Sequence, residues 1–367
     1  EAEIEKGTKG GARELFRIRE RLVTSLDLDP RSRLAFDGEI LRWNLMSTRA
    51  ERMEYISTQF VHLHDWAVEL KDRQSQSRIL RSYAFSHFDR GEMDEGMRLL
   101  ERALSTAEES QATSWTLCLY AKAAMQSRRG EFEAAKQTTR AMLRVAESRA
   151  ETVRAAQAYS HLAEIALQTH AYEEASQLLS EARHRYEAIG SRKGLAIAAL
   201  SKGEIHRAQG SLEAAIVCYK EAKERGENCE NSVALDAQIN LGITFVASER
   251  FAEARREFNA ILSKKGKDLL VYTRTAIRLG LINCQIAERD WSEAKSELNK
   301  LDTIVESTKM VDRDFASLAT LAGQSAQRAN QTTIARRAWK LALLQWERLG
   351  QGDKADEAAS ALESLVK

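Results

Sequence analysis

Apolar residues recur along most of the chain with the spacing of amphipathic helices. In one stretch Ala175, Leu179 and Ala182 occupy positions i, i+4 and i+7. This spacing places all three on one side of a helix, where they form a single apolar stripe. The sequence therefore predicts a chain built mainly of helices that bury one side.

A short turn pattern repeats along the chain and divides these helices into pairs. Each copy has a glycine or polar turn, a large residue, two further residues and then, three places after the large residue, a small one, as in Gly130-Glu-Phe132-Glu-Ala-Ala135. The residues at the large position are Met93, Phe132, Tyr172, Leu212, Phe251, Trp291 and Thr332, at spacings of 39, 40, 40, 39, 40 and 41. Seven copies at this regularity indicate a repeat rather than helix propensity alone.

Each copy predicts an antiparallel hairpin in which small residues face large ones. Before the turn, the first helix carries a small residue at Ala84, Ala123, Ala163, Gly203, Gly242 and Gly323. After the turn, the second helix carries a large residue at Leu100, Leu179, Tyr219, Phe258, Leu298 and Trp339. A hairpin of this kind cannot bury its stripe alone, so it must stack on neighbouring hairpins.

At these positions the sequence resembles the tetratricopeptide repeat family over residues 77–350. The shared features are the small residue on the first helix, the large-x-x-small turn and the large residue followed by a small one on the second helix. The resemblance implies an all-α, right-handed superhelical solenoid of antiparallel helix hairpins. The family proline after the second helix is missing, and the period is near 40 residues rather than 34, as in arrays resembling kinesin light chain and bacterial regulatory ATPases.

The two ends of the chain lack the motif. Residues 351–367 are expected to form a helical C-terminal cap. Residues 1–76 are expected to contain helices over 10–27, 31–46 and 49–72, which form a degenerate repeat, an N-terminal cap or the stump of a preceding domain. The start at Glu1 rather than Met leaves open that the chain is a fragment of a larger protein.

Composition supports the helical interpretation and narrows the partners. The chain has one proline, where average usage of about 5% predicts roughly 18. Its formal net charge is +1, which gives no overall field to attract nucleic acid or a membrane surface. The four cysteines, Cys118, Cys218, Cys229 and Cys284, lie far apart and are expected to be free, mostly buried thiols. No membrane span is visible, and we expect a cytoplasmic location.

Motifs that carry chemistry are scarce. The phosphate-loop, dinucleotide-binding, HExxH and GxSxG patterns are absent from the sequence. His62 and His64 are two residues apart, which on a helix turns them about 200° from each other and prevents a shared metal site. The tail Glu3–Gly11 and the basic residues near Arg192 and Lys264 have simpler interpretations as a flexible tail and solvated loops. We therefore expect no enzyme activity, no metal and no cofactor.

The family resemblance implies a concave inner face formed by the first helices of the hairpins. Its positions lie three before, one after and four after the small residue of each first helix. The predicted partner-binding residues are Tyr120, Ser160, Glu164, Leu200, Glu204, Arg207, Ile239, Ile243, Val246, Leu279, Asn283, Ile286 and Gln324. The stacked Lys, Asn and Arg side chains with which one subgroup of the family holds a terminal carboxylate are missing.

Two explanations account for the apolar inner positions between Ile239 and Ile286. In the first, a partner helix or an extended apolar peptide covers them, and Glu164 and Glu204 select positive charge at one end. In the second, the array winds tightly enough to cover them itself, or the N-terminal helices fold back. The leading functional prediction is a non-enzymatic module that binds a protein or peptide. The alternative is a ligand-sensing or autoinhibitory arm of a larger regulator.

Overall fold

The fold is known from a computed structural model, which describes residues 29–34, 37–38, 53–89, 92–109, 114–227, 233–265, 269, 271–308 and 312–365. Over these ranges the protein is all-α and contains no strand. The chain divides into two compact units, residues 1–171 and 172–367. Each unit is described by itself.

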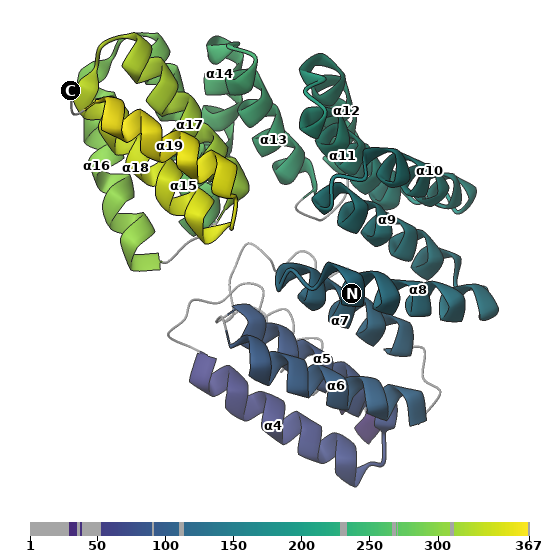
Figure 1. The fold of residues 1–367 in the computed structure, drawn as a ribbon. Coiled ribbons are helices and arrows are strands. Elements are labelled where there is room, and N and C mark those ends of the chain that lie inside the picture. Colours follow the sequence, from purple (N-terminus) through teal and green to yellow (C-terminus); the bar gives the residue numbers. More distant parts are fainter. Residues whose placement is uncertain are drawn as a thin grey trace. The chain divides into compact units, whose positions relative to one another are not determined.

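The first unit consists of helices that pack side by side in chain order (Figure 1). They are α4 (Met53–Glu69), α5 (Arg73–Asp89), α6 (Met93–Glu109), α7 (Ser114–Arg128), α8 (Phe132–Ser148) and α9 (Thr152–Gln168). Each contacts the next, and α7 also contacts α5 and α9. The hairpins predicted from the turn motif are α5 with α6 and α7 with α8.

The helices of the second unit also pack side by side (Figure 1). Its helices are α10 (Tyr172–Ala188), α11 (Arg192–Ala208), α12 (Leu212–Gly226), α13 (Val233–Ala247), α14 (Phe251–Lys265), α15 (Val271–Ala287), α16 (Trp291–Thr308), α17 (Arg313–Arg328), α18 (Thr332–Arg348) and α19 (Gly352–Ser364). They pack in chain order, except that α17 packs on α15 and not on α16. The pairs α11–α12, α13–α14, α15–α16 and α17–α18 are four of the predicted hairpins. The predicted C-terminal helix is α19, which packs on α18 and buries Ala355 and Ala358.

The predicted contact between small and large residues is confirmed in three hairpins. A Cβ atom placed on Gly203 would lie 2.5 Å from the Tyr219 ring, and one on Gly242 would lie 2.4 Å from the Phe258 ring. At Gly323 the same atom would lie 2.8 Å from Trp339. Real Cβ atoms do not approach other atoms this closely, so only glycine allows the two helices to pack at this distance. The rings are buried, and each contributes roughly 2 kcal/mol or more of burial free energy.

The predicted turns are built by one left-handed residue that closes the first helix of a hairpin. These residues have φ between 59° and 76°, and they are Gly130, His170, Gly210, Glu249, Arg289 and Asn330. In the turn at Gly210, its amide donates to the Arg207 carbonyl, and the Ser211 amide donates to the His206 carbonyl. This pair of hydrogen bonds satisfies the last free carbonyls of the helix and ends it without a proline. The proline deficit is therefore compatible with well-defined helix ends.

The N-terminal predictions are covered only in part. Helix α4 corresponds to the last expected helix of residues 49–72, and Phe60, Leu63 and Ala67 bury its apolar side. Residues 30–34 are helical, in agreement with the start of the helix expected over 31–46. The helix expected over 10–27 and the tail Glu3–Gly11 lie outside the described residues, as does Cys229. Cys118, Cys218 and Cys284 are free and buried, as expected.

Candidate binding face of the repeat array

In the second unit, four of the predicted apolar inner positions are buried by the chain itself. Ile243, Val246, Leu279 and Ile286 are at most 5% exposed and belong to one hydrophobic cluster. The cluster also contains Phe315, Leu318, Ala319 and Ala322 of α17. Helix α17 contacts both α15 and α13, so the last hairpin lies over the first helices of the two before it. This burial agrees with the second explanation given above, in which the array covers these residues itself.

Asn283 has a structural role at its inner position. Its Nδ2 donates to the carbonyl of Leu279, 2.9 Å away within α15, and to the carbonyl of Leu318, 3.0 Å away in α17. The side chain is 4% exposed, so both bonds are shielded from water. A buried amide that bridges two helices contributes to the register of α17 on α15 and is not free to read a ligand.

Arg207 is also engaged within the second unit. Its Nη1 lies 2.6 Å from Oδ1 of Asp314 and its Nη2 lies 3.4 Å from Oδ2, while its Nε donates to the Tyr219 hydroxyl at 3.2 Å. Burial by itself disfavours the guanidinium charge, but the carboxylate of Asp314 outweighs it and raises the pKa of Arg207. Burial raises the pKa of Tyr219, which therefore stays a neutral partner. The first helix of one hairpin is thus tied to α17, three hairpins later.

The remaining predicted positions of this unit are partly accessible. Leu200 and Ile239 are half-buried and pack against the large cluster. Glu204 is half-buried and accepts a hydrogen bond from Nδ2 of Asn240 at 3.5 Å. Gln324 donates to Glu357 of α19 at 3.3 Å. The accessible inner positions of this unit are thus a mixture of apolar and polar side chains and do not form a continuous apolar surface.

In the first unit the inner positions are open. Tyr120 of α7 is 37% exposed. In the next repeat, Glu164 of α9 is exposed, and Ser160, one helical turn before it, is half-buried. The surrounding protein reduces the hydration of the Glu164 carboxylate and raises its pKa, while Arg128 opposes that rise. Helices α7 and α9 contact each other, so an exposed aromatic ring and an exposed carboxylate occupy adjacent inner helices.

A buried histidine beside this face was not predicted. His161 is 4% exposed, its Nδ1 lies 2.9 Å from the Thr139 hydroxyl and its Nε2 lies 3.3 Å from the Ser127 hydroxyl. Its ring packs edge-on to Tyr120, with centroids 5.6 Å apart. Burial lowers the pKa of His161 to about 4, so the ring is neutral near pH 7.

The sequence contains one signal for this histidine. Thr139 occupies the place where other second helices carry a large apolar residue, such as Leu179 or Tyr219. Its hydroxyl donates to the Ala135 carbonyl at 2.7 Å and therefore accepts from Nδ1 of His161. A polar residue at that repeat position predicts a buried polar partner.

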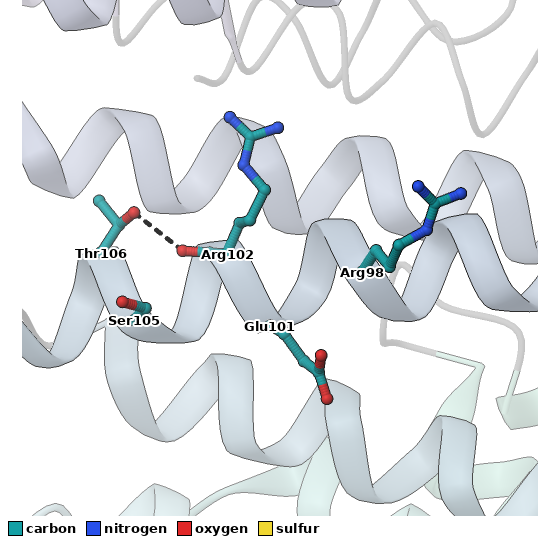
Figure 2. Close-up of a pocket in the computed structure, with 5 residues that line it drawn as sticks. All are labelled: Arg98, Glu101, Arg102, Ser105 and Thr106. Carbon is teal, nitrogen blue, oxygen red and sulfur yellow. Dashed lines mark hydrogen bonds between the residues drawn. The ribbon is translucent and has the colours of Figure 1, made fainter.

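The hollow on α6 has little capacity to bind a ligand. It is open, measures about 460 Å³ and is lined by Arg98, Glu101, Arg102, Ser105 and Thr106 (Figure 2). In Figure 2 the two arginines point away from Glu101, and Thr106 donates to the Arg102 carbonyl at 2.8 Å. The polar groups therefore do not converge on one point, and we assign it no role.

Within the described ranges, His, Cys, Asp and Glu form no group of three or more that could hold a metal ion. Likewise, no helix in that part of the chain combines the length and apolarity needed to cross a membrane.

The chain has a tetratricopeptide-repeat-like fold, with helices packed pairwise in a repeating array. Its fold is similar to RapI in its apo form, with a TM-score of 0.59 at 10% identity over 92% of both chains. A Rap protein complexed with Competence and Sporulation Factor gives a TM-score of 0.59 at 15% identity over 95% of this chain and 99% of that one. The apo form of the quorum sensor NprR from B. thuringiensis gives 0.52 at 14% identity over 99% and 100%. No family model and no curated protein sequence matches the chain.

Proposed function

We propose that the chain binds a peptide segment of a protein partner on the inner face of its first unit. The observation that carries the proposal is the pair of accessible side chains on adjacent inner helices, Tyr120 on α7 and Glu164 on α9. A Rap protein of similar fold is complexed with Competence and Sporulation Factor, which supports the use of this fold to bind a partner.

The side chains define the chemistry of the peptide. Tyr120 offers a large ring of which part is already fixed against His161, so little conformational entropy is lost when a partner packs on it. Glu164 sits where hydration is reduced, and a lysine or arginine of the peptide would add a second positive charge to that of Arg128. The expected ligand is therefore a short basic segment with one apolar or aromatic residue.

The apolar positions of the second unit take a different role in this proposal. Ile243, Val246, Leu279 and Ile286 stabilise the array, and Glu204 remains as an acidic inner position. The proposal thus keeps the inner face as the binding surface but moves its contacts toward the first unit.

Selection from a peptide library tests the proposal and finds the preferred ligand in the same step. A display library of linear twelve-residue peptides is selected on the full chain after depletion on a Glu164→Lys variant. The enriched peptides are then titrated by fluorescence polarisation. We expect Glu164→Gln and Tyr120→Ala each to weaken binding by about tenfold, which corresponds to roughly 1.4 kcal/mol.

The control is Glu133→Gln, which removes an exposed carboxylate from α8, a helix that carries none of the predicted inner positions. Equal affinities for wild type, Glu164→Gln and Tyr120→Ala would overturn the proposal. A selection that enriches no peptide would do the same.

A second candidate role is a ligand-sensing arm of a regulator. It is favoured by the similarity to the quorum sensor NprR, which extends over 99% of this chain and all of that one. Under this role, binding at Tyr120 and Glu164 would change contact with an effector, and a pull-down of effector proteins with and without a selected peptide would test it.

A further inference from the structure

A pocket lies between α10 and α11, away from the inner face. It has a volume of about 280 Å³, and its polar lining includes Ser180, Arg183, Lys202 and His206. At about 100° per residue, Ala198, Lys202 and Ile205 lie about 140–200° around α11 from the inner position Leu200. The pocket is therefore on the opposite side of α11, and nothing in the proposed peptide site uses it.

The floor and the walls of the pocket differ in chemistry. Leu179, Ala198 and Ile205 are buried and form an apolar floor, whereas the wall residues carry hydroxyl, guanidinium, ammonium and imidazole groups. An apolar cavity with a few polar groups directed to it is the usual form of a small-molecule site, and this volume is near the lower end of the usual range. The pocket fits a small ligand with an apolar body.

The donors on the walls are largely unused. In the part of the chain that the structure describes, Lys202 has no ion pair, and the Ser180 hydroxyl and the His206 ring have no hydrogen bond. Arg183 is held in place, since its Nε donates to Glu187 at 2.9 Å and its Nη2 lies 3.9 Å from Glu221. The wall thus offers a fixed cation and three available donors.

The charges around the pocket favour an anion. Two cations, Arg183 and Lys202, line it, and no carboxylate does. Arg183 is paired with Glu187 and Glu221, so Lys202 is the lining cation that has no ion pair in the described part of the chain.

We infer that this pocket binds a small monocarboxylate with an apolar body. Lys202 holds the carboxylate, Ser180 and His206 contribute hydrogen bonds, and Leu179, Ala198 and Ile205 contact the apolar part. Two sources supply this chemistry, namely a free organic acid and the C-terminal residue of a peptide that ends in an apolar side chain.

The test uses phenylacetate as the probe and its neutral isostere phenylacetamide, titrated into the full chain by saturation-transfer NMR. Phenylacetate is expected to bind at least about tenfold more tightly than phenylacetamide, because only the former forms a charge-assisted bond to Lys202. Lys202→Gln is expected to weaken phenylacetate binding by about tenfold, and Lys202→Arg to retain it. Ala198→Leu fills the floor and is expected to abolish binding of the probe.

Lys193→Gln is the matched control, since it removes an exposed lysine from the inner side of the same helix. Thermal melts followed by circular dichroism verify that each variant is folded. The inference is overturned if phenylacetate fails to bind, if phenylacetamide binds as tightly, or if folded Lys202→Gln and Ala198→Leu bind like wild type. The tripeptide Gly-Gly-Phe separates the two sources. A site for a peptide C-terminus binds the tripeptide with a free C-terminus more tightly than phenylacetate and more tightly than the amidated tripeptide. A site for a free organic acid binds phenylacetate more tightly than either tripeptide.

Discussion

The guanidinium of Arg207 pairs with the carboxylate of Asp314, which lies 107 residues further along the chain, through contacts of 2.6 and 3.4 Å. The pair joins α11 to the start of α17 and lies beside the helices whose apolar inner positions α17 covers. The side chains are 24% and 29% exposed, so water only partly screens them. The ion pair therefore helps to hold α17 in the position in which it covers these inner residues.

Asp314→Asn is expected to lower the free energy of unfolding by roughly 1–3 kcal/mol, because it leaves the Arg207 charge half-buried without its partner. Urea unfolding of the full chain measures the change. In a double-mutant cycle with Arg207→Met, the two losses should not add, since each substitution removes the same interaction. Glu288→Gln breaks the more exposed Arg255–Glu288 pair and serves as the control, with an expected loss below about 0.5 kcal/mol. Additive losses in the cycle would contradict the assigned coupling.

The repeat register was readable from the sequence, whereas this pair was not. The turn motif marks one turn in each hairpin, and the left-handed residues Gly130, Gly210 and Arg289 lie in these predicted turns, two residues before the large position. Such features are local, because each depends on residues within one hairpin. Arg207 and Asp314 meet only because small rotations between hairpins accumulate, and no local spacing encodes that sum. The same accumulation decided which inner positions α17 covers.

Gly242→Ala tests the close approach of the two helices in one hairpin. The new Cβ would lie 2.4 Å from the buried Phe258 ring, which also contacts Gly280 on its other side and cannot move away. We expect a loss of about 1–3 kcal/mol in urea unfolding, as for overpacked cores. Gly352→Ala is the control, because nothing lies within 4 Å of a Cβ there. A Gly242→Ala variant as stable as wild type would show that the hairpin tolerates a wider separation.

The left-handed turn residues predict a stabilising substitution. Glu249 has φ of 59° and is exposed, and glycine adopts this conformation without the strain of a side chain. Glu249→Gly is therefore expected to increase the free energy of unfolding by about 1 kcal/mol and so to raise the melting temperature. Gly210→Ala, at the equivalent turn with φ of 76°, is expected to decrease the free energy of unfolding by a similar amount and so to lower the melting temperature. Changes of the same sign in both variants would contradict the role assigned to the turn.

Burial of His161 predicts a pH-dependent stability. The pKa is lowered from 6.5 to about 4 in the folded protein, so folding favours the neutral ring. The stabilisation is fully present above pH 6.5 and is lost as the pH falls from 6.5 toward 4. The difference of about 2.5 pH units corresponds to at most roughly 3 kcal/mol.

His161→Asn should remove this part of the pH profile, while the other titrating groups remain. Unfolding free energies of both proteins between about pH 4 and 7 provide the comparison, and their difference is expected to narrow as the pH falls. His184→Asn changes an exposed histidine of α10 and should leave the wild-type slope unchanged. A constant difference between wild type and His161→Asn across this range would show that the ring is not held neutral.

Charge substitution at Leu279 tests whether the apolar inner positions of the second unit are part of the folded core or are available to a partner. Leu279 is fully buried in the cluster that includes Phe315 and Leu318 of α17, so a carboxylate there would have neither water nor a partner. Leu279→Asp is expected to cost about 4 kcal/mol or more and to give a largely unfolded chain by circular dichroism. Ile243→Asp should act in the same way, because Ile243 is only 5% exposed.

The matched control is Val217→Asp, which introduces the same charge on α12 at a position that is 65% exposed. Its expected effect is within about 0.5 kcal/mol, since the side chain stays in water. A folded Leu279→Asp protein would mean that α17 separates from α15 at little cost. The apolar inner positions of the second unit would then be available to a partner, and the first of the two explanations for their apolar character would hold.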